Sequence, residues 1–115
     1  MNKEKLYRLC GIDQVASATN APKWVSAQLR FLGAERYVLG TKTVEVSVQQ
    51  RSEGISLMFR HPLTIEASSL LGKRRKPGLL TDVDVVIGDV TMRLASMNKG
   101  MYPIVLRDEE RVALI

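Results

Sequence analysis

Four consecutive cations form the strongest chemical feature of the sequence. The run Lys73-Arg74-Arg75-Lys76 lies between two pairs of leucines. Such a run serves either as a solvated connection between strands or as a contact for an anionic partner. Arg74 and Arg75 could form bidentate hydrogen bonds with carboxylates, and all four side chains could equally contact phosphate. The segment predicts an electrostatic role and leaves the chemistry of the partner open.

A second group of charges is acidic. Asp82 and Asp84 are two residues apart, which on a strand places both carboxylates on one face, and with Asp89 nearby they could hold a divalent ion. Their alternation with Val83 and Val85 instead indicates a half-exposed strand, with the valines in the core and the aspartates facing water. We therefore expect no metal site and no cofactor.

Catalytic chemistry has few residues to use. His61 is the single histidine and precedes a proline, and Cys10 is the single cysteine. A general base needs a second group to orient it, and a His/Cys zinc site needs more ligands than these two. The sequence also lacks a glycine-rich phosphate-binding motif. We expect a protein that is not an enzyme and that acts by binding.

Composition bounds the class of protein. The chain has 115 residues with a formal net charge of +5, which suits one domain and favours an anionic partner. A lone cysteine fits a reducing compartment, so we expect a cytoplasmic protein. No apolar run approaches the roughly 20 residues that a membrane-spanning helix needs, and we expect no membrane partner.

The first third of the chain favours helices. Asn20 can cap a helix that begins at Pro22, and Gly33 can end it after Leu32. Between them the apolar residues Trp24 and Phe31 belong to a stripe with helical spacing. We predict a helical part over residues 1–33 and a β-rich part over residues 34–115 within a single domain.

The rest of the chain favours antiparallel strands. Residues 37–39 and 43–48 read as the arms of a hairpin that turns at Gly40-Thr41-Lys42. Further strands are predicted at 55–59, 63–67, 81–87, 90–95, 102–106 and 111–115, joined by turns at residues 51–54 and at Gly88-Asp89. The expected fold class is α+β, with two or three N-terminal helices packed on an antiparallel β-meander of about six to seven strands.

One binding hypothesis is a winged helix-turn-helix DNA-binding protein formed by residues 12–46. Its reading helix would run from Pro22 to Leu32 and direct Gln28 and Arg30 toward the groove. Lys42 would lie in the wing near phosphate. Under this alternative, nucleic acid is the partner.

The leading hypothesis comes from a resemblance. Residues 24–67 carry Leu32-Gly33 and then the segment Gly54-Ile-Ser-Leu-Met-Phe59, and this layout resembles the small immunity proteins that protect bacteria from polymorphic, contact-delivered toxins. The resemblance implies an amphipathic helix that ends at Leu32-Gly33, a charged hairpin and a strand.

The resemblance also implies a function by direct protein contact, without chemistry. The partner would be a protein toxin with an acidic contact surface, because this chain is basic. The predicted contact residues are the charged residues of the basic run and of the hairpin: Lys73, Arg74, Arg75, Lys76, Lys42 and Glu45. The sequence leaves the oligomeric state open.

Overall fold

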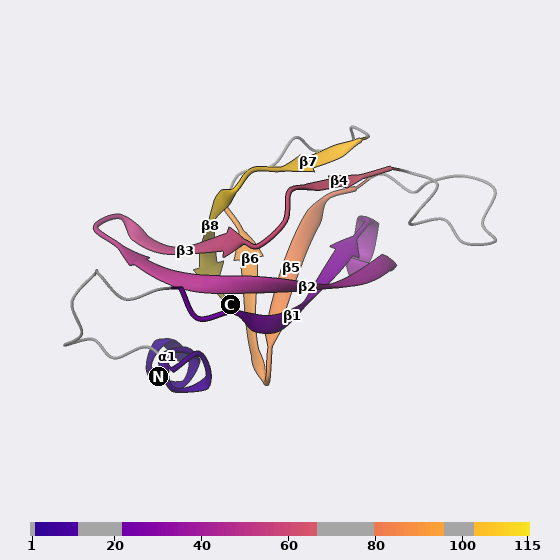
Figure 1. The fold of residues 1–115 in the computed structure, drawn as a ribbon. Coiled ribbons are helices and arrows are strands. Elements are labelled where there is room, and N and C mark those ends of the chain that lie inside the picture. The colour runs from indigo at the N-terminus through magenta and orange to yellow at the C-terminus, as the bar shows by residue number, and fades with distance from the viewer. Residues whose placement is uncertain (1, 12–21, 67–79, 96–102) are drawn as a thin grey trace.

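The chain forms a closed β-barrel. The computed structural model describes residues 2–11, 22–66, 80–95 and 103–115. Six antiparallel strands close in the order β1-β2-β3-β8-β6-β5, and β4 and β7 form a separate two-stranded sheet (Figure 1). The elements are α1 Asn2–Leu9, β1 Val25–Leu32, the 3₁₀ turn η1 Ala34–Arg36, β2 Val38–Arg51, β3 Gly54–Phe59, β4 Leu63–Ile65, β5 Asp82–Ile87, β6 Val90–Leu94, β7 Ile104–Leu106 and β8 Glu109–Leu114.

The predicted helix from Pro22 to Leu32 is wrong, because residues 25–32 form strand β1. Ala27, Leu29 and Phe31 are buried and alternate with polar residues, so this segment also has the period of a strand. Strand β1 hydrogen-bonds to β2 on one side and to β5 on the other. Because a short apolar run suits both periods, pairing with two neighbouring strands decides the outcome.

The predicted α+β class is therefore wrong. The described part of the chain contains one α-helix, α1, and the other elements are strands and one short 3₁₀ turn. Within the helical part predicted over residues 1–33, residues 2–9 form α1 and residues 25–32 form β1, while residues 12–21 fall outside the described residues. The protein is mostly β, and the expected layer of helices on a meander is replaced by a barrel.

The predicted hairpin turn at Gly40-Thr41-Lys42 is also wrong, because β2 runs through it as one strand of 14 residues. Phe31 pairs with Gly40 and Leu32 with Val38, which leaves one extra residue on β2 as a bulge. A bulge increases the local twist and bends the strand, as closure of a barrel requires. The predicted turns at residues 51–54 and at Gly88-Asp89 are confirmed, and they join β2 to β3 and β5 to β6.

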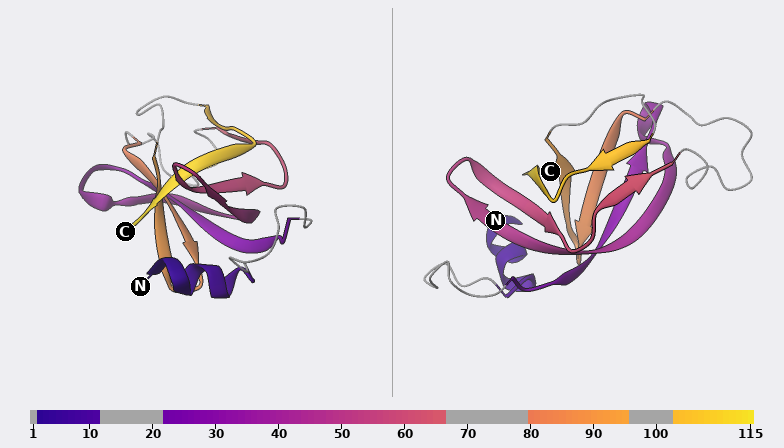
Figure 2. Two further views of the ribbon diagram at one scale, coloured as in Figure 1. Left: turned by 90° about the vertical axis from the view of Figure 1, so that its left-hand side faces the viewer. Right: turned by 45° about the horizontal axis from the view of Figure 1, so that its top comes forward.

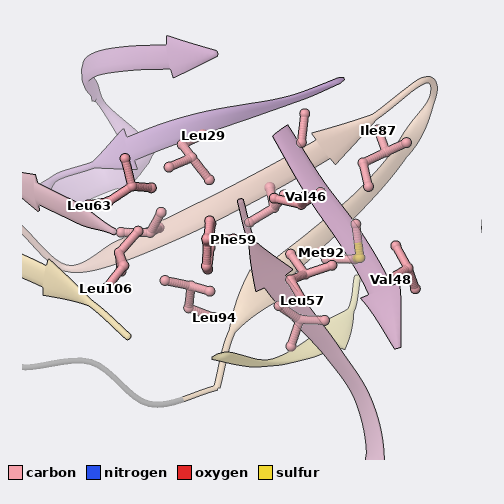
Figure 3. Packing of buried hydrophobic residues seen from close by; sticks show 14 of the residues in the cluster. Leu29, Val46, Val48, Leu57, Phe59, Leu63, Ile87, Met92, Leu94 and Leu106 are labelled. Carbon is pink, nitrogen blue, oxygen red and sulfur yellow. The ribbon is translucent and has the colours of Figure 1, made fainter. Parts of the chain in front are cut away.

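The hydrophobic core fills the barrel. Side chains from β1, β2, β3, β5 and β6 point into a shared interior, and Leu63 and Leu106 reach it from β4 and β7 (Figure 3). Phe31, Leu29 and Leu57 are fully buried. The alternation of apolar and polar residues along each strand places one set inside and the other outside.

Helix α1 packs against the β5–β6 turn, at the opposite end of the molecule from the β4–β7 sheet (Figures 1 and 2). Leu6 of α1 is fully buried, and Lys5 forms an ion pair with Asp89. A Cβ at Gly88, which has a φ of +59°, would lie 3.0 Å from the Leu9 side chain. No helix in the described ranges is long and apolar enough to cross a membrane.

Cys10, just after α1, is a buried thiol, and its burial raises its pKa to about 11. We expect iodoacetamide at pH 8 to modify Cys10 at least about 100-fold more slowly in the native protein than in urea, because the thiolate is the reactive form. The raised pKa also means that the stability linked to this thiol is complete below about pH 8.5 and is lost as the pH rises toward 11. Equal labelling rates with and without urea would contradict the buried position.

Candidate functional site

A buried carboxylate holds two arginines on the outer face of the barrel. The Asp84 side chain is 3% exposed. Its Oδ1 accepts a hydrogen bond from Arg93 Nε at 2.9 Å, and its Oδ2 accepts one from Arg36 Nη2 at 2.9 Å. Arg93 lies directly across from Asp84 on β6, whereas Arg36 comes from η1. One side chain therefore fixes cations from two separate elements.

A strained turn places Arg36 over this carboxylate. Glu35 and Arg36 have φ values of +56° and +61°, a conformation that side chains other than glycine adopt at a cost of roughly 1–2 kcal/mol each. The hydroxyl of Thr81 donates to the carbonyls of Leu32 and Gly33 at 3.1 and 3.2 Å and ties the turn to the start of β5. These hydrogen bonds hold Glu35 and Arg36 in their strained left-handed conformation, which places the Arg36 side chain over Asp84.

A third arginine extends the cluster along the same face. Arg30 of β1 lies directly across from Asp84 on β5, and its Nε donates to Gln28 at 2.9 Å. The hydrogen bond with Asp84 raises the pKa of Arg93 above its ordinary value, so Arg93 stays charged at every physiological pH. Three arginines here face two carboxylates, those of Asp84 and of Asp82, which lies 4.0 Å from Arg93.

We call Arg30, Arg36 and Arg93, together with Tyr37 and Val38, which follow Arg36 in the chain, the arginine surface. Side chains of Arg36 and Arg93 are 61% and 31% exposed, so each keeps contact with solvent while bonded to Asp84. Tyr37 and Val38 are 55% and 43% exposed. Preordered guanidinium groups suit a carboxylate-bearing ligand, because a guanidinium can bind a carboxylate through two parallel hydrogen bonds.

The predicted contact residues of β2 do not form one site. Lys42 is exposed and lies across from Leu29, whereas Glu45 accepts a hydrogen bond from Arg60 at 3.0 Å. Because the two are three residues apart on one strand, they point to opposite faces. Arg60 also lies over the Trp24 ring, 5.7 Å from its centroid. Lys73, Arg74, Arg75 and Lys76 fall outside the described residues.

The strand at Asp82–Ile87 is expected from the sequence to bury its valines and expose its aspartates. The prediction is confirmed for Val83 and Val85, which are buried, but it is wrong for Asp84, which is buried as well. Within the described ranges no group of three or more histidine, cysteine, aspartate or glutamate side chains could hold a metal ion. Both oxygens of Asp84 instead accept hydrogen bonds from arginines.

Sequence reasoning missed the arginine surface. Arg30 and Arg93 occupy polar positions of alternating strands, a pattern that predicts exposure but not which strand lies alongside. Arg36 carries no local signal, because its left-handed backbone conformation suits glycine rather than arginine. The register between β1, β5 and β6 brings these residues together.

Comparison of the chain with models of protein families, with curated proteins and with solved structures returns no match.

Proposed function

We propose that the protein is a non-enzymatic binding protein whose arginine surface takes up an acidic segment of a protein partner. The observation that carries the proposal is the pairing of Asp84 with both Arg36 and Arg93. A buried acceptor orders the two guanidinium groups before any ligand arrives, so less conformational entropy is lost on binding. Arginine and tyrosine are also the residues that most often dominate the energy of protein interfaces.

The immunity hypothesis is a specific form of this proposal, in which the partner is a toxin with an acidic contact surface. Its strand element, Gly54–Phe59, corresponds to β3, but Leu32-Gly33 ends strand β1 rather than an amphipathic helix. We do not retain the winged helix-turn-helix alternative, because residues 25–32 of its reading helix form that strand.

The charge pattern favours an acidic protein segment over a nucleic-acid backbone. Asp82 Oδ1 lies 4.0 Å from Arg93 Nε, and Glu35 precedes Arg36 in the chain, so acidic residues interrupt the run of cations. A nucleic-acid interface usually presents an extended basic stripe. A short peptide segment needs only one or two carboxylates placed to bond with the exposed parts of Arg36 and Arg93.

The proposal is tested by fluorescence anisotropy with a labelled peptide that alternates glutamate with valine, at ~50 mM and ~200 mM salt. We expect Arg36→Gln to weaken binding about tenfold, or about 1.4 kcal/mol, which would place Arg36 among the minority of interface residues that cost more than about 1 kcal/mol when truncated. Arg8→Gln, which removes the same charge from the exposed side of α1, should leave binding nearly unchanged. Equal effects of the two substitutions would contradict a local site, and tighter binding of duplex DNA than of the peptide would replace the proposed partner.

A further inference from the structure

The first half of β2 has an open edge. Strand β2 pairs with β1 through Val38–Val46, but its pairing with β3 begins only at Val46. On the edge of β2 that faces β3, the hydrogen bond from the Arg60 amide to the Glu45 carbonyl, 3.2 Å long, is the one nearest the start of β2 among the described residues. Among the described strands none pairs with the other side of residues 38–44. Figure 1 shows β3 lying along only one half of β2.

The direction of the backbone groups on this edge follows from the Glu45 bond. Because the Glu45 carbonyl points toward Arg60, it points away from β1. Amide and carbonyl groups of alternate residues in an antiparallel strand point the same way. Those of Thr43 and Thr41 therefore also point away from β1, toward the open edge, and the side chains of all three residues from Thr41 to Thr43 are exposed.

We propose that this edge receives an extended acidic segment of a partner as an additional strand. Strand addition combines main-chain hydrogen bonds with side-chain contacts at alternate positions. Thr41 and Thr43 would supply the main-chain groups, and Lys42 would face an acidic side chain of the added strand. Arg36 precedes β2 but bonds to Asp84 of β5, and β1 lies between β5 and β2, so the open edge and the arginine surface lie on opposite sides of β1. The charge of the exposed Lys42 is what favours an acidic strand at this edge. The choice of an acidic ligand also rests on the proposed function, whereas the mode of binding rests on the strand pairing.

The charge on this edge argues against a second copy of the chain as the occupant. In a two-fold antiparallel pairing centred on Lys42, the two copies of Lys42 would lie directly opposite each other. Like charges in such a pair are destabilising, and lysine on an edge strand commonly prevents self-association. An acidic strand would instead place a carboxylate at that position.

Amide hydrogen exchange followed by NMR tests this inference on the full chain with the glutamate–valine peptide. We expect the Thr41 and Thr43 amides to exchange at least about tenfold more slowly with saturating peptide, because new main-chain hydrogen bonds protect them. A peptide of the same charge, N-methylated at alternate residues, should give no such protection.

Substitution on the edge provides a second readout. Thr43→Pro removes an amide that points toward the open edge, a position where an edge strand tolerates proline. We expect it to weaken peptide binding about tenfold, while Thr43→Val, which keeps the amide, preserves binding. The exchange measurement on the unsubstituted protein decides the matter if the proline variant does not fold.

The outcomes separate the two proposals. Peptide binding that responds to Arg36→Gln without protecting Thr41 or Thr43 would overturn strand addition and leave the proposed function in place. Absence of peptide binding would overturn both. Protection that appears without peptide and grows with protein concentration would overturn the acidic occupant and assign the edge to a second copy.

Discussion

Replacing Arg36 and Arg93 together by alanine should lower the free energy of unfolding by about 3–5 kcal/mol, because it leaves a buried carboxylate without its ion-pair partners. The Asp84 side chain is 3% exposed, and these arginines are its hydrogen-bond donors. Each single substitution should cost less, since Asp84 keeps one donor. The Arg93 substitution should be the more costly, because Arg93 is the less exposed of the two. Urea denaturation measures each loss.

A matched background isolates the cause. Asp84→Val removes the carboxylate and continues the valines of β5, so by itself it should change stability little or raise it. In the Asp84→Val protein, replacing Arg36 and Arg93 by alanine should lower the free energy of unfolding by well under half of the loss expected in the unsubstituted protein. An equal cost in both backgrounds would mean that the arginines stabilise the barrel by packing rather than through Asp84. Asp84→Val should still weaken binding of the acidic peptide, because the guanidinium groups lose the acceptor that orders them.

Phe31→Ala should destabilise the protein by about 3–5 kcal/mol, the usual cost of removing a fully buried aromatic side chain. Trp24→Ala should cost about 1 kcal/mol, because Trp24 is partly exposed and its described ring contact is with Arg60. A helix over residues 22–32 would place both aromatic residues on one buried stripe and make the two losses similar. Chemical denaturation of both variants therefore distinguishes the strand from the predicted helix.

Strands that are bounded by a turn with a glycine could be predicted from the sequence. Gly54 lies before one run of alternating apolar and polar residues, and Gly88 lies between two more, which predicts β3, β5 and β6. Both glycines have positive φ values in the structure, as such turns require. The segment after Pro22 was ambiguous, because its apolar residues fit a helical stripe as well as a strand. Gly40 suggested a turn, but the barrel needs a long strand at this point, and the bulge beside Phe31 absorbs the bend.

The candidate site could be predicted only in part, because it is made of cross-strand neighbours. The spacing of Asp82 and Asp84 correctly placed both on one face of a strand, and it gave no sign that Arg93 of β6 and Arg36 of η1 would cover Asp84. Such partners are fixed by strand register and by the conformation of η1. Neither has a local signature in the sequence.

The most direct test of the proposed function is an NMR titration of the isotope-labelled protein with the glutamate–valine peptide. The arginine surface predicts large amide shifts at residues 30–38, 82–84 and 93, with Arg36 among them, besides those that strand addition would cause at residues 41–43. Arg36→Gln should remove most of the shifts at residues 30–38, 82–84 and 93. Shifts confined to α1 or to residues 73–76, with none at Arg36 or Arg93, would contradict the claim that this surface binds the acidic partner.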